Sequence, residues 1–190
     1  DRLLNEKFMD ISLPSDNKIS LIPPHQSTAT LLPEVDESII NLIHNKALDF
    51  PNNVALSSEE GQITYKVLVE KINQLSNFLK SYHKDKDARI IIALPRGIDS
   101  IISLLAVLQN GCTYIPIDLN WPKERQQFVL HDSRASIVLT YGVYSQNFNS
   151  NNKHIVVALD EKAGEIEKAS KEFMPEKTNL EDIAYIIYTS

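Results

Sequence analysis

The sequence predicts an α/β fold in which helices cover a mainly parallel sheet. Short, mostly apolar runs recur from residue 90 onward, as in IIIALP (Ile90–Pro95) and SIVLTY (Ser136–Tyr141). Runs of this length and character suit strands that are buried on both faces. Amphipathic stretches of helical length separate the runs, and strands that alternate with helices along a chain form parallel sheets.

The composition is that of a globular protein with an acidic surface. Of the 190 residues 43% are apolar and 23% charged, which is ordinary for such proteins, and the net charge is −6. This charge argues against a surface for nucleic acid or anionic membrane. No apolar stretch is long enough to span a bilayer. The single cysteine, Cys112, allows no internal disulfide and fits a reducing, cytoplasmic setting.

Two parts are expected along the chain. Residues 1–33 lack periodicity and carry four prolines, a composition typical of an irregular linker. The α/β domain is expected over residues 34–190.

The first half of the domain reads as a helix, a hairpin and a second helix. Asp36 is the expected cap of a helix over 37–49. VALSSEEGQITY (Val54–Tyr65) predicts two short strands around a turn at 59–61. Thr64 is the expected cap of a helix over 66–82. The buried stripes are expected at Ile39, Leu42, Ile43, Ala47 and Phe50 in the first helix and at Leu68, Ile72, Leu75, Leu79 and Tyr82 in the second.

The second half alternates strands and helices. Gly111 suits the left-handed position after a helix. We expect strands at 90–95, 112–118, 136–141 and 154–160, and helices at 98–110, 122–131 and 161–172. A last strand, Ile183–Tyr188, is expected to be buried on both faces inside the sheet.

Two hydroxyl residues, Thr189 and Ser190, follow this last strand. Loops that bind phosphate often begin where a buried strand ends, because hydroxyls and backbone N–H groups there can point at an anion. Thr189 and Ser190 are therefore the residues to which we assign a binding role.

Several blocks carry a resemblance to a known family. IAYIIYTS (Ile183–Ser190) resembles the opening of the signature L-A-Y-x-x-Y-T-S-G-[ST]-T-G-x-P-K-G of adenylate-forming enzymes. LQNGCTYIPID resembles L-K-A-G-x-A-Y-x-P-[LI]-D, and departs from it at Gln109, Asn110 and Thr113. WPKER and DSRASIVLT follow, and are similar to Y-P-x-E-R and D-S-x-A-x-x-V-L-T. The helix start TYKVL is similar to T-Y-x-E-L, with Val67 in place of the usual Glu. Within that superfamily, which includes acyl-CoA synthetases and luciferases, the blocks are most similar to the adenylation domains of nonribosomal peptide synthetases.

The resemblance implies an ATP-dependent ligase. Such a domain joins ATP and an amino acid into an aminoacyl adenylate, with Mg²⁺ on the phosphates. It then loads the acyl group onto the phosphopantetheine thiol of a carrier domain. Thr189 and Ser190 would contact the ATP phosphates. Residues 1–33 resemble the segment between an upstream condensation domain and an adenylation domain.

By the same resemblance, residues 34–190 are the N-terminal part of an adenylation domain, cut within the phosphate-loop signature. The substrate pocket and the catalytic lysine of the family lie beyond Ser190, so neither the catalytic residues nor the amino acid can be assigned. We expect the 190-residue chain to be inactive by itself.

Structural roles are expected for the other notable residues. Pro116 and Asp118 are expected to shape a strand exit, Glu124 and Arg125 to form an ion pair, and Cys112 to fill the core. The histidines lack the spacing of metal ligands, so we expect no metal site: His25, His44, His83, His131 and His154.

Three interpretations remain open. The chain is either part of such an enzyme or a non-catalytic scaffold or docking module between domains. A related acyl-CoA-synthetase-like ligase is the third possibility. The residues that follow Ser190 in the parent gene would distinguish the enzyme from the scaffold.

Overall fold

Four apolar strands form a parallel sheet at the centre of the domain. The computed structural model describes residues 37–59, 61–82, 88–149, 154–179 and 181–189, so the expected linker at 1–33 lies outside the described residues. The strands are β3 (Arg89–Ile92), β4 (Thr113–Pro116), β5 (Ile137–Thr140) and β6 (Ile155–Ala158), in the order β4-β3-β5-β6 with every pair parallel. The predicted α/β class is confirmed.

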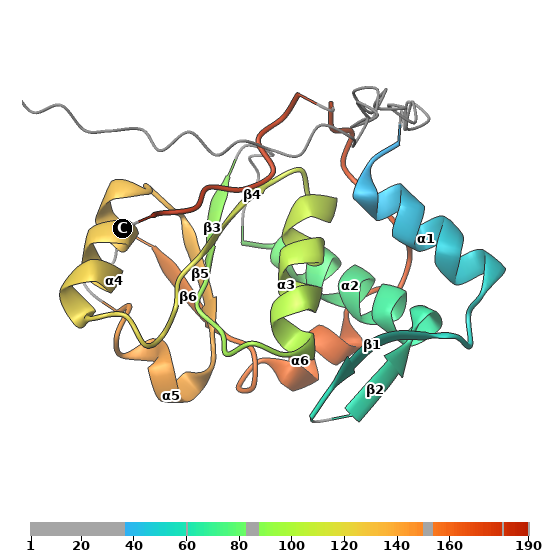
Figure 1. Ribbon diagram of the computed structural model, residues 1–190, viewed down its shortest axis with the longest axis horizontal. Helices are drawn as coiled ribbons and strands as arrows, with labels where there is room; N and C mark the ends of the chain where they lie inside the picture. The colour runs from blue at the N-terminus through green and yellow to red at the C-terminus, as the bar shows by residue number, and fades with distance from the viewer. Residues whose placement is uncertain (1–36, 60, 83–87, 150–153, 180, 190) are drawn as a thin grey trace, which may run out of the picture. The chain divides into compact units, whose positions relative to one another are not determined.

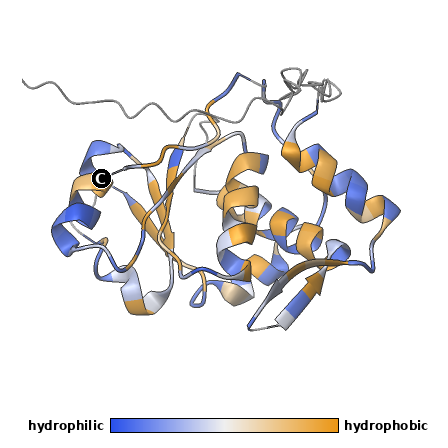
Figure 2. Cartoon of the chain, in the orientation of Figure 1, coloured by the Kyte–Doolittle hydropathy of each residue, from blue (hydrophilic) through white to orange (hydrophobic). Residues whose placement is uncertain are grey.

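Helices cover both faces of this sheet. Successive strand residues point to opposite faces, so the apolar runs make both faces apolar. Ile90 and Ile92 of β3 pack on the face covered by α2 (Tyr65–Leu79) and α3 (Ile98–Gln109). Ile91 packs on the other face, against α4 (Lys123–Asp132). Figure 1 shows the sheet between these two groups of helices. In Figure 2 hydrophobic residues follow the strands and α3, where the core lies.

The helix starts and ends follow local chemistry. The Thr64 hydroxyl accepts a hydrogen bond from the backbone N–H of Val67 at 3.4 Å and caps α2, as predicted. Gly111 takes the left-handed conformation after α3, with a φ of 65°. The hairpin of β1 (Val54–Ser58) and β2 (Gly61–Thr64) is antiparallel, also as predicted.

Helix α1 (Ile39–Asp49) begins later than predicted, and its buried stripe agrees with the prediction only in part. Ser38 caps it, accepting from the N–H of Asn41 at 3.3 Å, whereas Asp36 lies outside the described residues. Ala47 is buried as predicted and Ile43 packs against the core, but the second buried residue is Ile40. The stripe was partly misplaced because two neighbouring sets of apolar residues both fit the helical period, leaving exposed Ile39, Leu42 and Phe50.

Two further helices differ from the prediction. α6 covers only Ala163–Lys168 instead of 161–172, and none of its residues is buried. The chain after it is held by α2 rather than by helical bonds. One short helix, α5 (Gly142–Ser145), was not predicted, because its four residues are too few to show periodicity.

A strap, defined as residues 170–176, lies along α2. The Asn73 side chain donates to the carbonyl of Lys171 at 2.9 Å, and Asn77 donates to the carbonyls of Ser170 and Glu172. Lys80 reaches the carbonyl of Met174 at 2.7 Å. Because these donors sit on one helix face, α2 replaces the missing helical bonds of the strap.

The terminal segment, defined as residues 183–189, corrects the prediction of an interior strand. Among the described residues its only strand neighbour is β4, through one parallel bridge between Tyr114 and Tyr185. It therefore lies at the edge of the sheet, outside β4. Ile183, Tyr185 and Ile187 are more than half exposed. The apolar run indicates extended structure, but burial also requires neighbours on both sides.

Candidate functional site

The candidate site lies at the carboxyl edge of the sheet. Parallel strands end at the same edge, and the crevice outside those ends is where open α/β sheets bind ligands. β3, β4 and the terminal segment are parallel, so Thr189 emerges at this edge. Its side chain is exposed, as a phosphate contact requires. Ser190, the other predicted contact, lies outside the described residues.

A cleft of about 620 Å³ opens beside the terminal segment. Ile187, two residues before Thr189, is one of its walls, and the loops after β3 and β4 supply most of the others. Its charged lining residues are Arg96 and Asp118. The volume is in the range of small-molecule sites.

The exit of β4 is shaped by Pro116 and Asp118, as predicted. Pro116 is the last residue of the strand. The carboxylate of Asp118 then accepts from the N–H of Asn120 at 2.9 Å, and its carbonyl accepts from the N–H of Trp121 at 3.1 Å. This turn directs the chain into α4.

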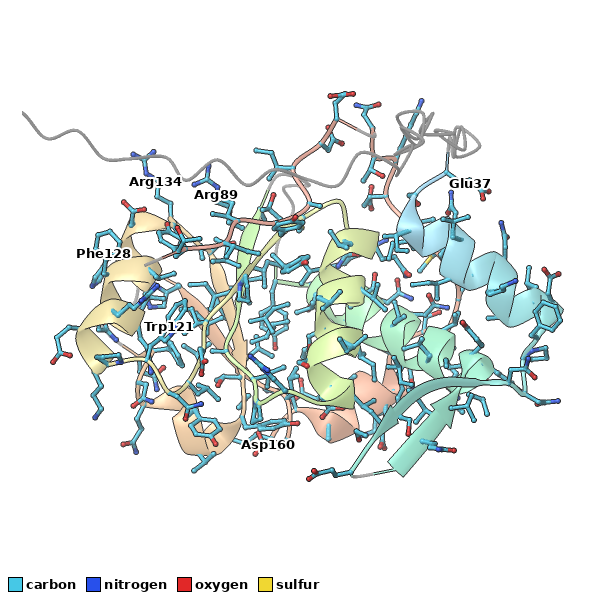
Figure 3. All side chains as sticks on the ribbon, in the orientation of Figure 1. Glu37, Arg89, Trp121, Phe128, Arg134 and Asp160 are labelled. Carbon is cyan, nitrogen blue, oxygen red and sulfur yellow. The ribbon has the colours of Figure 1, made fainter. Side chains whose placement is uncertain are left out.

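Helix α4 contacts the residue that precedes Thr189. The carbonyl oxygen of Tyr188 accepts from Nη2 of Arg125 at 3.3 Å, and its phenol donates to Oδ2 of Asp132 at 2.6 Å. The ring meets Phe128 edge-on, with 6.2 Å between centroids. Figure 3 shows Phe128 and Trp121 on the side of the molecule formed by α4.

The predicted ion pair between Glu124 and Arg125 is wrong. The Arg125 guanidinium lies over the indole of Trp121, 4.2 Å from the ring centroid, and binds Tyr188, whereas Glu124 is exposed. Side chains of adjacent helical residues point in different directions, which separates the two charges.

The surroundings raise the pKa values of two phenols at this edge. Burial, followed by the hydrogen bond to Asp132, raises the pKa of Tyr188 to about 12. Burial also raises the pKa of Tyr114, and the neighbouring Tyr185 adds to the effect. The folded protein therefore keeps the Tyr188 phenol protonated above pH 10, where an ordinary tyrosine loses its proton.

Cys112 is 1% exposed, which confirms its predicted place in the core. Within the described ranges no group of three or more His, Cys, Asp or Glu residues is placed to hold a metal ion. In the same ranges no helix is long and apolar enough to cross a membrane.

The contacts of Tyr188 with Arg125 and Asp132 were not predicted. All three residues belong to blocks that carried the family resemblance, which was the available signal. Their proximity depends on the placement of α4 against the terminal segment, and the local sequence does not contain that information.

Comparison with known proteins finds relatives that are similar in sequence. It is 33% identical over 190 residues to a mycosubtilin synthase protein of Bacillus subtilis, covering all of this chain and 7% of that protein. It is 36% identical over 160 residues to gramicidin S synthase 1 of Brevibacillus brevis, covering 82% of this chain and 14% of that protein. The chain therefore spans a small part of these relatives.

Among solved structures, the fold is similar to that of the nonribosomal peptide synthetase FmoA3 with α-methyl-L-serine-AMP bound. The TM-score is 0.72 at 23% identity, over 79% of this chain and 17% of that chain. Residues 43–190, which include the cleft and the terminal segment, match the family described as AMP-binding enzyme. With most of its length inside that match, the chain belongs to the AMP-binding enzyme family.

Proposed function

We propose that the chain is the N-terminal part of an amino-acid-activating adenylation domain of a nonribosomal peptide synthetase. The observation that carries the proposal is the similarity over its full length to a mycosubtilin synthase protein, together with the AMP-binding match. The solved structure of similar fold holds an amino acid joined to AMP, which is the kind of product expected here.

In the proposed reaction, a carboxylate oxygen of the amino acid attacks the α-phosphorus of ATP. The bond between the α-phosphorus and the bridging oxygen breaks, and pyrophosphate leaves. The acyl group then passes to the phosphopantetheine thiol of a carrier domain, releasing AMP. An upstream condensation domain and a cytoplasmic location, where ATP is available, belong to the same proposal.

Thr189 and Ser190 take the role of phosphate contacts. Catalysis of this kind depends on positioning and on neutralising charge, and hydroxyls at a strand end suit both needs. The exposed Thr189 at the carboxyl edge supports the assignment. Mg²⁺ on the ATP phosphates belongs to the same proposal and would neutralise part of their charge.

The test is exchange of labelled pyrophosphate into ATP by the full-length protein that contains this chain, with each common amino acid in turn. Exchange with at least one amino acid is expected. Exchange that is absent with every amino acid, or that occurs without any, contradicts the proposal.

The role of Thr189 is tested by Thr189→Ala, with Thr189→Ser as the matched control that keeps the hydroxyl. Loss of one preorganised donor slows a reaction about ten- to a thousandfold. We expect Thr189→Ala to slow exchange in this range and Thr189→Ser to stay near the wild type. Equal rates for both variants contradict the assignment. The 190-residue chain alone is expected to give no exchange.

A further inference from the structure

Tyr188 lies lengthwise on one stripe of α4. Its carbonyl meets Arg125, its ring meets Phe128, and its phenol meets Asp132. These three helix residues are spaced by three and four positions and so share one face. Tyr188 is the last residue before Thr189, and it is held at its backbone and at the tip of its side chain.

Arg125 binds the backbone of the terminal segment just beyond the last hydrogen bond between that segment and β4. Tyr114 donates to the carbonyl of Ala184 at 3.1 Å and accepts from the N–H of Ile186 at 3.1 Å. In a parallel ladder the next donor on β4 is the residue two positions on. That residue is Pro116, which has no N–H. Beyond Ile186 the backbone of the terminal segment is therefore held by the Arg125 side chain instead of by β4.

Arg125 is itself fixed. Its guanidinium stacks on Trp121 at 4.2 Å, and this planar group loses little freedom when it binds. The helix start is fixed too, because the buried side chain of Gln126 donates to the carbonyls of Leu119 and Trp121 at 3.1 and 2.9 Å. Val129, one turn after Arg125, is buried in the core between the helix and the sheet.

We propose that Arg125 and Asp132 are positioning residues, which act through Tyr188 to set the place of the Thr189 hydroxyl in the adenylate-forming reaction. The inference rests on the proposed function and adds the device that aligns its phosphate contact. Neither residue touches the reacting atoms.

The experiment compares Tyr188→Phe, Asp132→Ala and the double variant in the full-length protein by pyrophosphate exchange. Misplacing a reacting group by about 1 Å can cost about a hundredfold in rate. We expect each single variant to lower kcat by at least about tenfold. The KM for the amino acid should stay unchanged, because Arg125 and Asp132 are proposed to act on the phosphate contact of Thr189 and not on the amino acid. The double variant should be no slower than the slower single variant, since both remove one contact.

Arg125→Lys keeps the charge but loses the planar fork, and it is expected to lower kcat with the same unchanged KM. Glu124→Gln is the matched control on the same helix turn, and its exposed side chain should leave kcat within about twofold. Unfolding midpoints of all variants identify any that fail to fold. If Tyr188→Phe or the Asp132 variant fails to fold, the kcat of Arg125→Lys tests the inference in its place.

An active wild type with unaffected kcat in Tyr188→Phe and Arg125→Lys overturns the inference while leaving the proposed function intact. A raised KM for the amino acid with unchanged kcat also overturns it. Absence of exchange in the wild type contradicts the proposed function and, with it, this inference.

Discussion

Ser76 and Asn110 join helix α2 to the end of helix α3 through a reciprocal pair of hydrogen bonds. The Ser76 hydroxyl donates to Oδ1 of Asn110 at 2.7 Å, and Nδ2 of Asn110 donates to the Ser76 carbonyl at 2.9 Å. Both residues are 0% exposed. Asn110 is one of three positions at which the chain departs from the family signature. The other two also hydrogen-bond distant segments: Gln109 donates to Asn73, and Thr113 to the carbonyl of Ile183.

We expect Asn110→Ala to lower the free energy of unfolding by about 1–3 kcal/mol, because it leaves a buried hydroxyl without its partner. The double variant with Ser76→Ala should lose less than the sum of the two single losses. Denaturant unfolding of the 190-residue chain measures both. Asn45→Ala, an exposed amide on α1, is the control and should change the value by less than about 0.5 kcal/mol. Additive losses would contradict the reciprocal pair.

Removal of the Asn73 side chain should loosen the strap. This amide donates to the carbonyl of Lys171 and accepts from Gln109, and both partners lose it in Asn73→Ala. A local loss of about 1–2 kcal/mol raises the open population about five- to thirtyfold. Chymotryptic cleavage next to Phe173 should accelerate accordingly. Glu70→Gln, which breaks only the exposed 2.7 Å ion pair with Lys171, should change the rate little. Equal acceleration in both variants would refute the role of Asn73.

Stability at high pH should depend on Tyr188. Burial of its phenol and then the bond to Asp132 raise its pKa in the folded protein to about 12, from an ordinary value of 10.0. The folded state therefore holds this proton more tightly. Its stabilisation is complete below pH 10 and is lost as the pH rises from 10 to about 12. Across this window the unfolding free energy of the wild type should fall more steeply than that of Tyr188→Phe. Parallel curves would show that Tyr188 has an ordinary pKa.

The outer edge of the terminal segment should promote association of the 190-residue chain. Tyr185 and Ile187 are 53% and 58% exposed on one face of an extended segment, and such edges pair with other chains. We expect Ile187→Lys to shift sedimentation toward the monomer, because a charged residue on an edge opposes pairing. Val143→Lys makes the same change at an exposed position of α5 and should leave association as it was. A chain that is monomeric at all concentrations would contradict the expectation.

The sequence predicted the elements whose signals are local. The apolar runs of β3 and β5 and the hydroxyl cap of α2 are each encoded within a few residues. The burial of Ile40 rather than Ile39 in α1 was not predictable, because both residues start equally good helical stripes. The partial burial of the terminal segment depends on how many strands flank it, which its own apolar residues do not encode.

The candidate site also contains features that the local sequence predicts and features that it does not. The exposed position of Thr189 agrees with its prediction as the hydroxyl after a strand, and its phosphate contact stays a prediction. The contact between Arg125 and Tyr188 joins residues 63 positions apart and depends on the placement of α4. Pattern alone favoured a partner for Arg125 that was close in sequence, and Glu124 was the adjacent carboxylate.

The separation between β4 and the terminal segment has a consequence for synthesis on the ribosome. Thr113 and the Ile183 carbonyl that it binds are 70 residues apart in the chain. At about 5–20 residues per second, the ribosome needs about 4–14 s to supply the second partner after the first. β3 precedes β4 by far fewer residues, so the edge of β4 that faces β3 can pair early. The edge of β4 that faces the terminal segment stays unpaired until residues 183–189 have been synthesised. During those seconds a nascent chain presents Tyr114 unpaired, and on a crowded polysome the nearest competing strand belongs to a neighbouring copy.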